Sequence, residues 1–292
     1  MKFTSYFFAF LIVTLITVIS IPAQAQVPLG LYDNFKTKLL DPTKWAGRER
    51  GAGIGGIMLE SSRKIMTDPI LLSRGSDIQE RVYGDTATDT GLSEGANELV
   101  FIDGTDITTI QAIVEVKSLK VIGCAANSDA TRAGAVINGL FFNTGTPTSG
   151  SSLNDVGALL GIWRLSNSSD PPNVLEVVGI VYQCLDAKCG TFNQLDSKSL
   201  GTVHLKQTAK LQITWDKTNH QFIFQKGKST PVPSTYAVSD TDPPGTSNGG
   251  AKHLGVLQYV ASCDMTKTTQ PRPVAFMEAF FENVFVNASA LP

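Results

Sequence analysis

Two carboxylates at a fixed separation can act as acid and base or as acid and nucleophile. Glu278 and Glu282 fall on one face of a predicted strand. Four residues of strand span about 13 Å, more than the roughly 5–10 Å that glycoside hydrolysis requires. We therefore expect both to be solvated strand positions. Glu115, between Val114 and Val116, has no partner nearby in the sequence, and a pair formed across neighbouring strands stays open.

Two glycine motifs match functional patterns but lack the required context. Residues 51–56 fit G-x-G-x-x-G, a dinucleotide-binding turn that needs an apolar strand before it. The charged residues 48–50 precede it instead. Residues 245–249 fit G-x-S-x-G, a nucleophile elbow that needs a strand-to-helix turn, but here the motif follows two prolines in a polar segment. We interpret both as loops.

Metal-binding residues form no recognisable set. The spacing of the three histidines fits no metal motif: His204, His220 and His253. Asp103 with Asp106, and Asp85 with Asp89, could offer oxygen ligands to Ca²⁺. Acids in turns are, however, common for backbone reasons alone. The sequence predicts no metal site and no cofactor, with Ca²⁺ as the alternative.

The four cysteines are Cys124, Cys184, Cys189 and Cys263. An even number in an exported chain favours disulfides, and four cysteines allow three pairings. Cys184 and Cys189 flank a short turn between two extended segments, so we expect them to pair, which leaves Cys124 for Cys263. The rival interpretation is a metal site, but C-x4-C lacks the second cysteine or histidine pair that would complete it.

The N-terminal segment predicts export. Lys2 precedes an apolar stretch over residues 7–21, and Pro22 and then Ala23-Gln24-Ala25 follow. These are the three parts of a cleavable signal peptide, and the stretch is shorter than the roughly 20 residues of a spanning helix. We expect cleavage after residue 25, with an uncleaved anchor as the alternative. Residues 26–292 contain no second long apolar run, so we expect a secreted or periplasmic chain without a membrane span.

Composition narrows the choice of partner. Lys and Arg number 24 against 26 Asp and Glu, and no basic run appears. Nucleic acid is therefore excluded as a partner, because phosphate binding needs clustered Lys and Arg. Charged residues make up only 17% of the chain, and there are 26 glycines. This composition is typical of an exported β-protein.

Strand patterns recur along the chain, whereas helical periodicity is hard to find. Residues 110–117 alternate apolar and polar side chains, as in a half-buried strand. Residues 210–225 predict a hairpin that turns at residues 216–220. Residues 144–154 and 229–252 are rich in Gly, Ser, Thr and Pro, and we expect them to be exposed loops. Many short strands of this kind predict a sandwich or barrel.

The ends of the mature chain carry further motifs. It opens with residues 31–35 (LYDNF) and 40–45 (LDPTKW), and it closes with residues 280–286 (FFENVFV). With these motifs and the Trp215-Asp216 step of the hairpin, the chain resembles the concanavalin A-like lectin/glucanase superfamily, which includes laminin G-like domains. The resemblance covers nearly all of residues 26–292. It implies one all-β jelly-roll domain, a two-sheet antiparallel sandwich with the first and last strands side by side.

The resemblance does not supply an activity, because that superfamily contains lectins, glycosidases and adhesion modules. Its glucanases typically carry Glu-x-Asp-x-x-Glu on one strand, and this motif is absent from the sequence. We therefore expect an exported, non-catalytic module that binds carbohydrate or a surface glycan, and we assign no catalytic or ligand-binding residue. The alternatives are a glycoside hydrolase or lyase with carboxylates on separate strands, and a structural or adhesive extracellular protein.

Aromatic side chains are the remaining candidates for sugar contacts. From their apolar surroundings we expect all three tryptophans to be buried: Trp45, Trp163 and Trp215. The tyrosines whose surroundings constrain them less are Tyr83, Tyr182, Tyr236 and Tyr259. None of these is singled out by the sequence.

Overall fold

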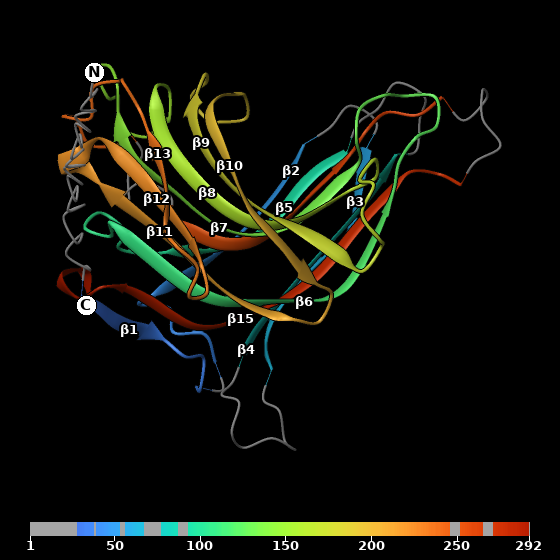
Figure 1. Ribbon diagram of the computed structural model, residues 1–292, viewed down its shortest axis with the longest axis horizontal. Helices are drawn as coiled ribbons and strands as arrows, with labels where there is room; N and C mark the ends of the chain where they lie inside the picture. Colours follow the sequence, from blue (N-terminus) through green and yellow to red (C-terminus); the bar gives the residue numbers. More distant parts are fainter. Residues whose placement is uncertain are drawn as a thin grey trace, which may run out of the picture.

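The computed structural model describes residues 28–37, 39–52, 56–66, 77–86, 93–245, 252–264 and 271–291. Within them the chain forms two antiparallel β-sheets that pack face to face (Figure 1). The predicted all-β sandwich is confirmed. The predicted signal peptide, residues 1–25, lies outside the described residues.

The two sheets differ in their strands. Sheet A has the order β13-β12-β11-β6-β15-β4-β3, and β1 also pairs with β15. Its strands are β1 (Leu29–Asp33), β3 (Gly56–Met66), β4 (Asp77–Thr86), β6 (Thr109–Ile122), β11 (Thr208–Asp216), β12 (Gln221–Lys226), β13 (Val232–Thr235) and β15 (Val274–Asn287). Sheet B has the order β10-β9-β8-β7-β14-β5-β2. Its strands are β2 (Trp45–Ala52), β5 (Ser93–Phe101), β7 (Arg132–Asn143), β8 (Asp155–Leu165), β9 (Val174–Cys184), β10 (Phe192–His204) and β14 (His253–Val260).

The first and last strands lie side by side, as the resemblance implies. Leu29 of β1 pairs with Asn287 of β15. The Asn287 side chain then ties β15 to the start of β6, because its Oδ1 accepts hydrogen bonds from the backbone N–H groups of Thr108 and Thr109. Its Nδ2 donates to the carbonyl of Asp106. The first and last of the described strands are therefore fastened to each other and to β6 in sheet A.

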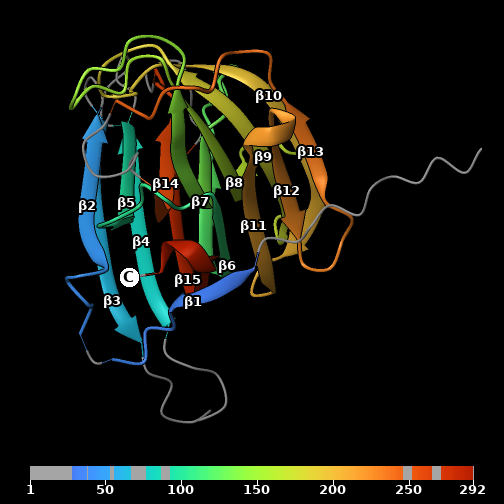
Figure 2. The ribbon, with the colours of Figure 1, turned by 90° about the vertical axis from the view of Figure 1, so that its left-hand side faces the viewer.

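Sheet B is curved. Its strands follow one another from β2 to β10 across Figure 2, and β7, β8 and β9 bend along their length in Figure 1. The face of sheet B that is turned away from sheet A lies on the inside of this bend. We call it the hollow face. Side chains alternate between the two faces of a strand, so every second residue of sheet B belongs to it.

The core lies between the sheets, where the sequence pattern places it. Ile110, Ala112, Val114 and Val116 of β6 are all buried in it. On the hairpin strands the inward residues Leu211, Ile213, Phe222 and Phe224 are fully buried as well. Each large apolar side chain removed from water contributes roughly 1.5–3 kcal/mol, so this alternation stabilises the face-to-face packing.

Two predicted loops and one glycine motif have different outcomes. Residues 144–154 form the connection between β7 and β8, as expected. Residues 229–252 are not one loop, because β13 lies within them and pairs with β12. Pro233 sits in β13, an edge strand, where a residue without an N–H is tolerated. The loop predicted for residues 51–56 is wrong at its ends, because Gly51 and Ala52 are the last residues of β2 and Gly56 is the first residue of β3; residues 53–55 lie outside the described part of the chain.

Two disulfides join the loops. Cys124, just after β6, is bonded to Cys263, just after β14, across a sequence separation of 139 residues. Cys184 is bonded to Cys189 and closes the turn between β9 and β10. These are the pairs that the spacing favours.

The only helices within the described residues are two turns of three residues each, Lys217–Asn219 and Ala288–Ala290. Neither approaches the length that a bilayer-spanning helix requires.

Lys252 is an unusual member of the core. Its side chain is fully buried at the start of β14, with Nζ 4.7 Å from the centre of the Phe141 ring. Burial lowers the pKa of Lys252 to about 7, against the opposing effect of the Asp106 charge. The folded protein therefore releases a proton that the unfolded chain, with a lysine pKa near 10.4, keeps.

We predict that Lys252 makes stability depend on pH. Between about pH 7 and pH 10 the unfolded state binds the extra proton, so the unfolding free energy of the wild type should rise with pH. The rise cannot exceed about 1.4 kcal/mol per pH unit for one proton. Urea unfolding of the wild type and Lys252→Met at several pH values isolates this effect. The two curves should converge or cross as pH rises above 7, and a constant difference would contradict the prediction.

Candidate functional site

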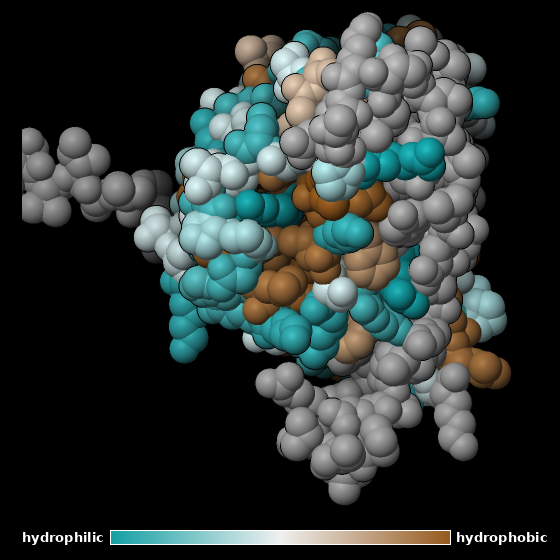
Figure 3. Space-filling view, turned by 90° about the vertical axis from the view of Figure 1, so that its right-hand side faces the viewer, coloured by the Kyte–Doolittle hydropathy of each residue, from teal (hydrophilic) through white to brown (hydrophobic). Residues whose placement is uncertain are grey.

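The hollow face carries a second apolar cluster, although neither of the two described sheets packs on it. Its buried members are Val136, Leu140, Leu159, Tyr182 and Cys184, with Trp163, Ile180, Cys189 and Leu257 partly buried beside them. Apolar surface also gathers at the end of the molecule shown in Figure 3, where hydrophilic side chains surround it. Enclosed apolar surface on a soluble protein often marks a binding site. The hollow face is therefore the first place to look for one.

Trp163 lies flat on this face. A β-carbon at Gly134, the residue opposite Trp163 on β7, would overlap the indole ring. A β-carbon at Gly161 would lie 2.6 Å from the indole Nε1. The ring therefore covers two backbone positions that only glycine leaves open. The side chain is partly exposed, and its buried Nε1 has no hydrogen-bond partner among the described residues.

Tyr182 is placed in the same way at the other end of the face. A β-carbon at Gly157, its partner on β8, would come within 2.5 Å of the phenol ring. The ring is buried, and its hydroxyl donates to Oδ1 of Asn138 at 2.8 Å. Gly157 thus sets the height of the ring above the sheet, and Asn138 sets its direction.

A row of polar side chains crosses the face from Tyr182. The Nδ2 atom of Asn138 lies 3.4 Å from Nε2 of His253, which lies 3.3 Å from Oε1 of Glu98. The other oxygen of Glu98 forms an ion pair with Nε of Arg48. Arg48 also reaches Nδ1 of His253 at 3.5 Å. Arginine and an amide nitrogen only donate, so Nδ1 of His253 faces one donor, whereas Nε2 faces both the Asn138 donor and the Glu98 acceptor.

The five strands that supply this row are far apart in sequence. Tyr182 lies on β9, Asn138 on β7, His253 on β14, Glu98 on β5 and Arg48 on β2. All but Arg48 are nearly or fully buried. Hydrogen bonds and the Arg48–Glu98 pair satisfy these buried groups. The row is polar and ordered, and Arg48 is the member that reaches solvent.

The hollow face does not hold two close carboxylates within the described residues. Its acids are Glu94 and Glu98 on β5, Glu176 on β9 and Asp155, which is fully buried at the start of β8, eight residues from Trp163, the partner of Glu176. Glu94 and Glu98 are four residues apart on one strand, or about 13 Å. Glu176 is four strands from β5, or about 19 Å at the usual strand spacing. Both separations exceed those of paired glycosidase carboxylates.

Sheet A brings together a pair that the sequence left open. Glu115 lies opposite Phe280, and Glu282 lies opposite Ile113, so the two acids are diagonal neighbours on β6 and β15. Diagonal β-carbons are about 7–8 Å apart, which falls in the range of inverting glycosidases. Both side chains are buried, however, and Lys117 Nζ lies 2.8 Å from Glu115.

The prediction that Glu278 and Glu282 are both solvated is wrong for Glu282, which is buried. Glu278 is partly exposed and accepts a hydrogen bond from Gln79 of the neighbouring strand β4. The ammonium group of Lys117 covers the Phe280 ring at 4.9 Å. The ring nearest Glu115 is therefore covered by a lysine side chain.

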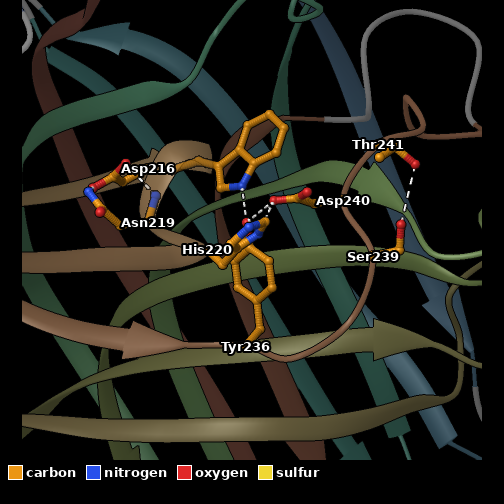
Figure 4. Close-up of polar contacts among 8 residues, drawn as sticks. Asp216, Asn219, His220, Tyr236, Ser239, Asp240 and Thr241 are labelled. Atoms are coloured by element: carbon orange, nitrogen blue, oxygen red, sulfur yellow. Dashed lines mark hydrogen bonds and ion pairs between the residues drawn. The ribbon is translucent and has the colours of Figure 1, made fainter.

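A second polar cluster fastens the β11–β12 hairpin (Figure 4). Trp215 Nε1 donates to the Tyr236 hydroxyl at 2.8 Å, and that hydroxyl donates to Asp240 Oδ2 at 2.7 Å. His220 Nδ1 lies 3.0 Å from the same oxygen. Burial and the hydrogen bond to Asp240 raise the pKa of Tyr236 well above its usual value. The His220 side chain is mostly exposed, but its contact with the buried Asp240 carboxylate fixes the direction of the ring.

The aromatic predictions are partly correct. Trp45 is buried against Tyr32 and Phe101 near the paired chain ends, as expected. Trp215 is partly buried against the core. Trp163 is also partly buried, but it lies on the hollow face and not against the core between the sheets.

The four candidate tyrosines differ in their exposure to solvent. Tyr182 and Tyr236 are buried and hydrogen-bonded. Tyr259 is partly exposed beneath the Arg132 guanidinium, which lies 4.2 Å from its ring centre. The Tyr83 side chain lies outside the described part of the structure. Tyr259 and Arg132 are close to the Trp163 end of the hollow face, since Leu257 lies opposite Gly134 and Gly134 opposite Trp163.

The structure describes the side chains of two of the four acids that were considered as Ca²⁺ ligands. Asp103 and Asp106 are exposed in the turn between β5 and β6. No group of three metal-ligating side chains occurs among the residues that the structure describes. Asp85 has no described side chain, and Asp89 lies outside the described residues.

No protein family and no curated protein matches this chain. Solved structures with a similar arrangement include an endo-β-galactosidase from Clostridium perfringens, with 7% identity and a TM-score of 0.40 over 92% of this chain and 65% of that one. The chain thus spans 65% of that enzyme's length.

Two others are a carbohydrate-binding module, CBM66, from Bacillus subtilis and a glycosyl hydrolase family 16 protein from Mycobacterium smegmatis. The first has 10% identity and a TM-score of 0.32, covering 80% and 95% of the two chains. The second has 14% identity and a TM-score of 0.32, covering 85% and 97%. At such scores these likenesses decide nothing about activity or ligand.

We predict that the glycine beneath Trp163 is required for its position. Gly134→Ala places a methyl group in the space of the indole ring, so the ring must lift or the strands must move. The expected cost is about 1–3 kcal/mol of unfolding free energy, with a shift in tryptophan fluorescence. Gly190→Ala is the control, because the nearest atom to its β-carbon would be 3.5 Å away. Equal stability of both variants would contradict the prediction.

Proposed function

We propose that this protein binds carbohydrate on the hollow face of sheet B and does not hydrolyse it. The observation that carries the proposal is the Trp163 ring, laid flat on Gly134 and Gly161 with part of its surface exposed. A flat aromatic ring presents apolar area at low conformational cost, and the C–H-rich face of a sugar ring can stack on it. The side chain cannot tilt into the sheet, so its orientation is fixed before a ligand arrives.

Polar groups beside the ring supply the second requirement. A sugar carries hydroxyls that need hydrogen-bonding partners when they leave water. Arg48 at one edge of the polar row is partly exposed, and Glu94, Arg132 and Glu176 lie around the Trp163 end of the face. Binding sites for small molecules combine apolar walls with a few placed polar groups in this way.

Hydrolysis requires two carboxylates close to the glycosidic bond, which the hollow face does not provide among the described residues. The outward positions of β8, at its centre, are Gly157, Leu159, Gly161 and Trp163, and none can exchange a proton with a substrate. The acids of the face are too far apart to share a glycosidic bond. The two disulfides are compatible with a location outside the cytoplasm, and we propose that binding takes place there.

Removing the indole ring should weaken carbohydrate binding. We expect the wild type to be retarded by at least one polysaccharide in affinity electrophoresis with laminarin, mixed-linkage β-glucan, xyloglucan, agarose and levan. Trp163→Ala should lose at least about tenfold in affinity, as is usual for a central aromatic contact. Phe285→Ala, a partly buried ring on sheet A, is the control. Wild-type protein that no polysaccharide retards would overturn the proposal.

The hydrolase alternative has its own test, on Glu115 and Glu282. We expect no release of reducing sugar from the same polysaccharides by the wild type, since both acids are buried and Glu115 is paired with Lys117. Glu115→Gln should then change stability alone. Turnover by the wild type that disappears in Glu115→Gln would instead assign catalysis to sheet A.

A further inference from the structure

Phe192, the first residue of β10, is the one aromatic side chain among the described residues that is mostly open to solvent. Its exposed fraction is 51%, whereas the other aromatic rings described are buried or intermediate. An exposed phenylalanine costs solubility and contributes little to folding. Packing in the core therefore does not explain why a phenylalanine occupies this position.

Register places this ring at the rim of the hollow face. Phe192 pairs with Cys184, whose side chain belongs to the cluster on that face. Opposed residues of a strand pair point to the same side. The ring lies against Tyr182, with 5.5 Å between ring centres and an angle of 60° between the planes. Phe192 thus continues the aromatic surface from the interior of the hollow to the edge of the sheet.

The segment that carries Phe192 is held rigidly. The Cys184–Cys189 disulfide closes the turn before it. Within the turn the carboxylate of Asp186 accepts hydrogen bonds from the backbone N–H groups of residues 188, 190 and 191. These bonds, the one from Gly190 first, lower the pKa of Asp186. A ring on such a frame loses little conformational entropy when it meets a ligand.

The rim and Trp163 lie at opposite ends of the hollow face. Trp163 is opposite Glu176, and Gly157 is opposite Tyr182. Six residues of β8 separate these pairs, which corresponds to about 20 Å. A single sugar ring cannot touch both ends.

We infer that Phe192 is a specificity-determining contact at the far end of the proposed carbohydrate site, so that the preferred ligand is an extended oligosaccharide chain that reaches from Trp163 to the β10 edge. This inference rests on the proposed function. Beyond that function, the inference states that the ligand is long and that Phe192 distinguishes long chains from short ones. The central ring at Trp163 contributes to the binding of any length, whereas Phe192 contributes only when the chain is long enough to arrive at it.

The test compares ligand lengths. Oligosaccharides of increasing length, prepared from whichever polysaccharide retards the wild type, are titrated by calorimetry into wild-type protein, Phe192→Ala, Leu185→Ala and Trp163→Ala. Leu185 is the matched control, because it is equally exposed, at 51%, and belongs to the same closed turn. Leu185 follows the last residue of β9, and its side chain is not part of the apolar cluster on the hollow face.

We expect Phe192→Ala to lose about tenfold in affinity for the longest chains, equal to roughly 1.4 kcal/mol, and to match the wild type on the shortest. Leu185→Ala should match the wild type throughout, and Trp163→Ala should be weak throughout. Three results would overturn the inference while leaving carbohydrate binding intact: no effect of Phe192→Ala, the same loss at every length, or an equal loss in Leu185→Ala. Failure of the wild type to bind any length would instead count against the proposed function.

Discussion

The absence of β-carbons at a few positions of β7 and β8 is the constraint on which the hollow face depends. Gly134, Gly157 and Gly161 leave space directly above the backbone, and the rings of Trp163 and Tyr182 occupy it. Glycine in a strand interior weakens the strand, so the face gains these ring positions at some cost in stability. The main core between the sheets has to supply that stability, and its large, fully buried side chains do so.

The same constraint explains why the face is buried without a covering sheet. Rings that lie flat shield their neighbours, and Val136, Leu140 and Leu159 fill the spaces between them. Polar groups in this setting need partners within the protein. The row from Tyr182 through Asn138 and His253 to Glu98 supplies them in sequence, and Arg48 ends it at solvent. Packing and hydrogen bonding thus fix one arrangement of the face before any ligand binds.

Local patterns predicted much of the fold. The alternation over residues 110–117 and in the hairpin over residues 210–225 identified the strands that became β6, β11 and β12. Short spacing also favoured the Cys184–Cys189 pair. β13 was not predicted, because prolines are typical of loops but are also tolerated in edge strands.

The candidate site was harder to predict, because its members meet through register. Tyr182, Asn138, His253, Glu98 and Arg48 come from five strands, and a shift of one residue in any strand would turn its side chain to the other face. Trp163 was expected in the core because residues 159–165 are apolar on both faces except at Arg164. The regular placement of glycine on β8 was a visible signal, but it can be interpreted only after the faces are assigned.

The acids illustrate why position decides between binding and catalysis. Glu98 sits on the promising face, but Arg48 and His253 both direct hydrogen-bonding groups at it, so it acts as an acceptor inside the protein. Glu115 and Glu282 have a suitable spacing, but they are buried on sheet A, where Lys117 covers the nearby ring. A glycosidase needs both properties in one place: two close carboxylates, and an open surface that holds the sugar across them. Among the described residues, this sandwich places the diagonal pair Glu115 and Glu282 on sheet A and the flat Trp163 ring on sheet B, and this separation supports the proposed binding role of sheet B.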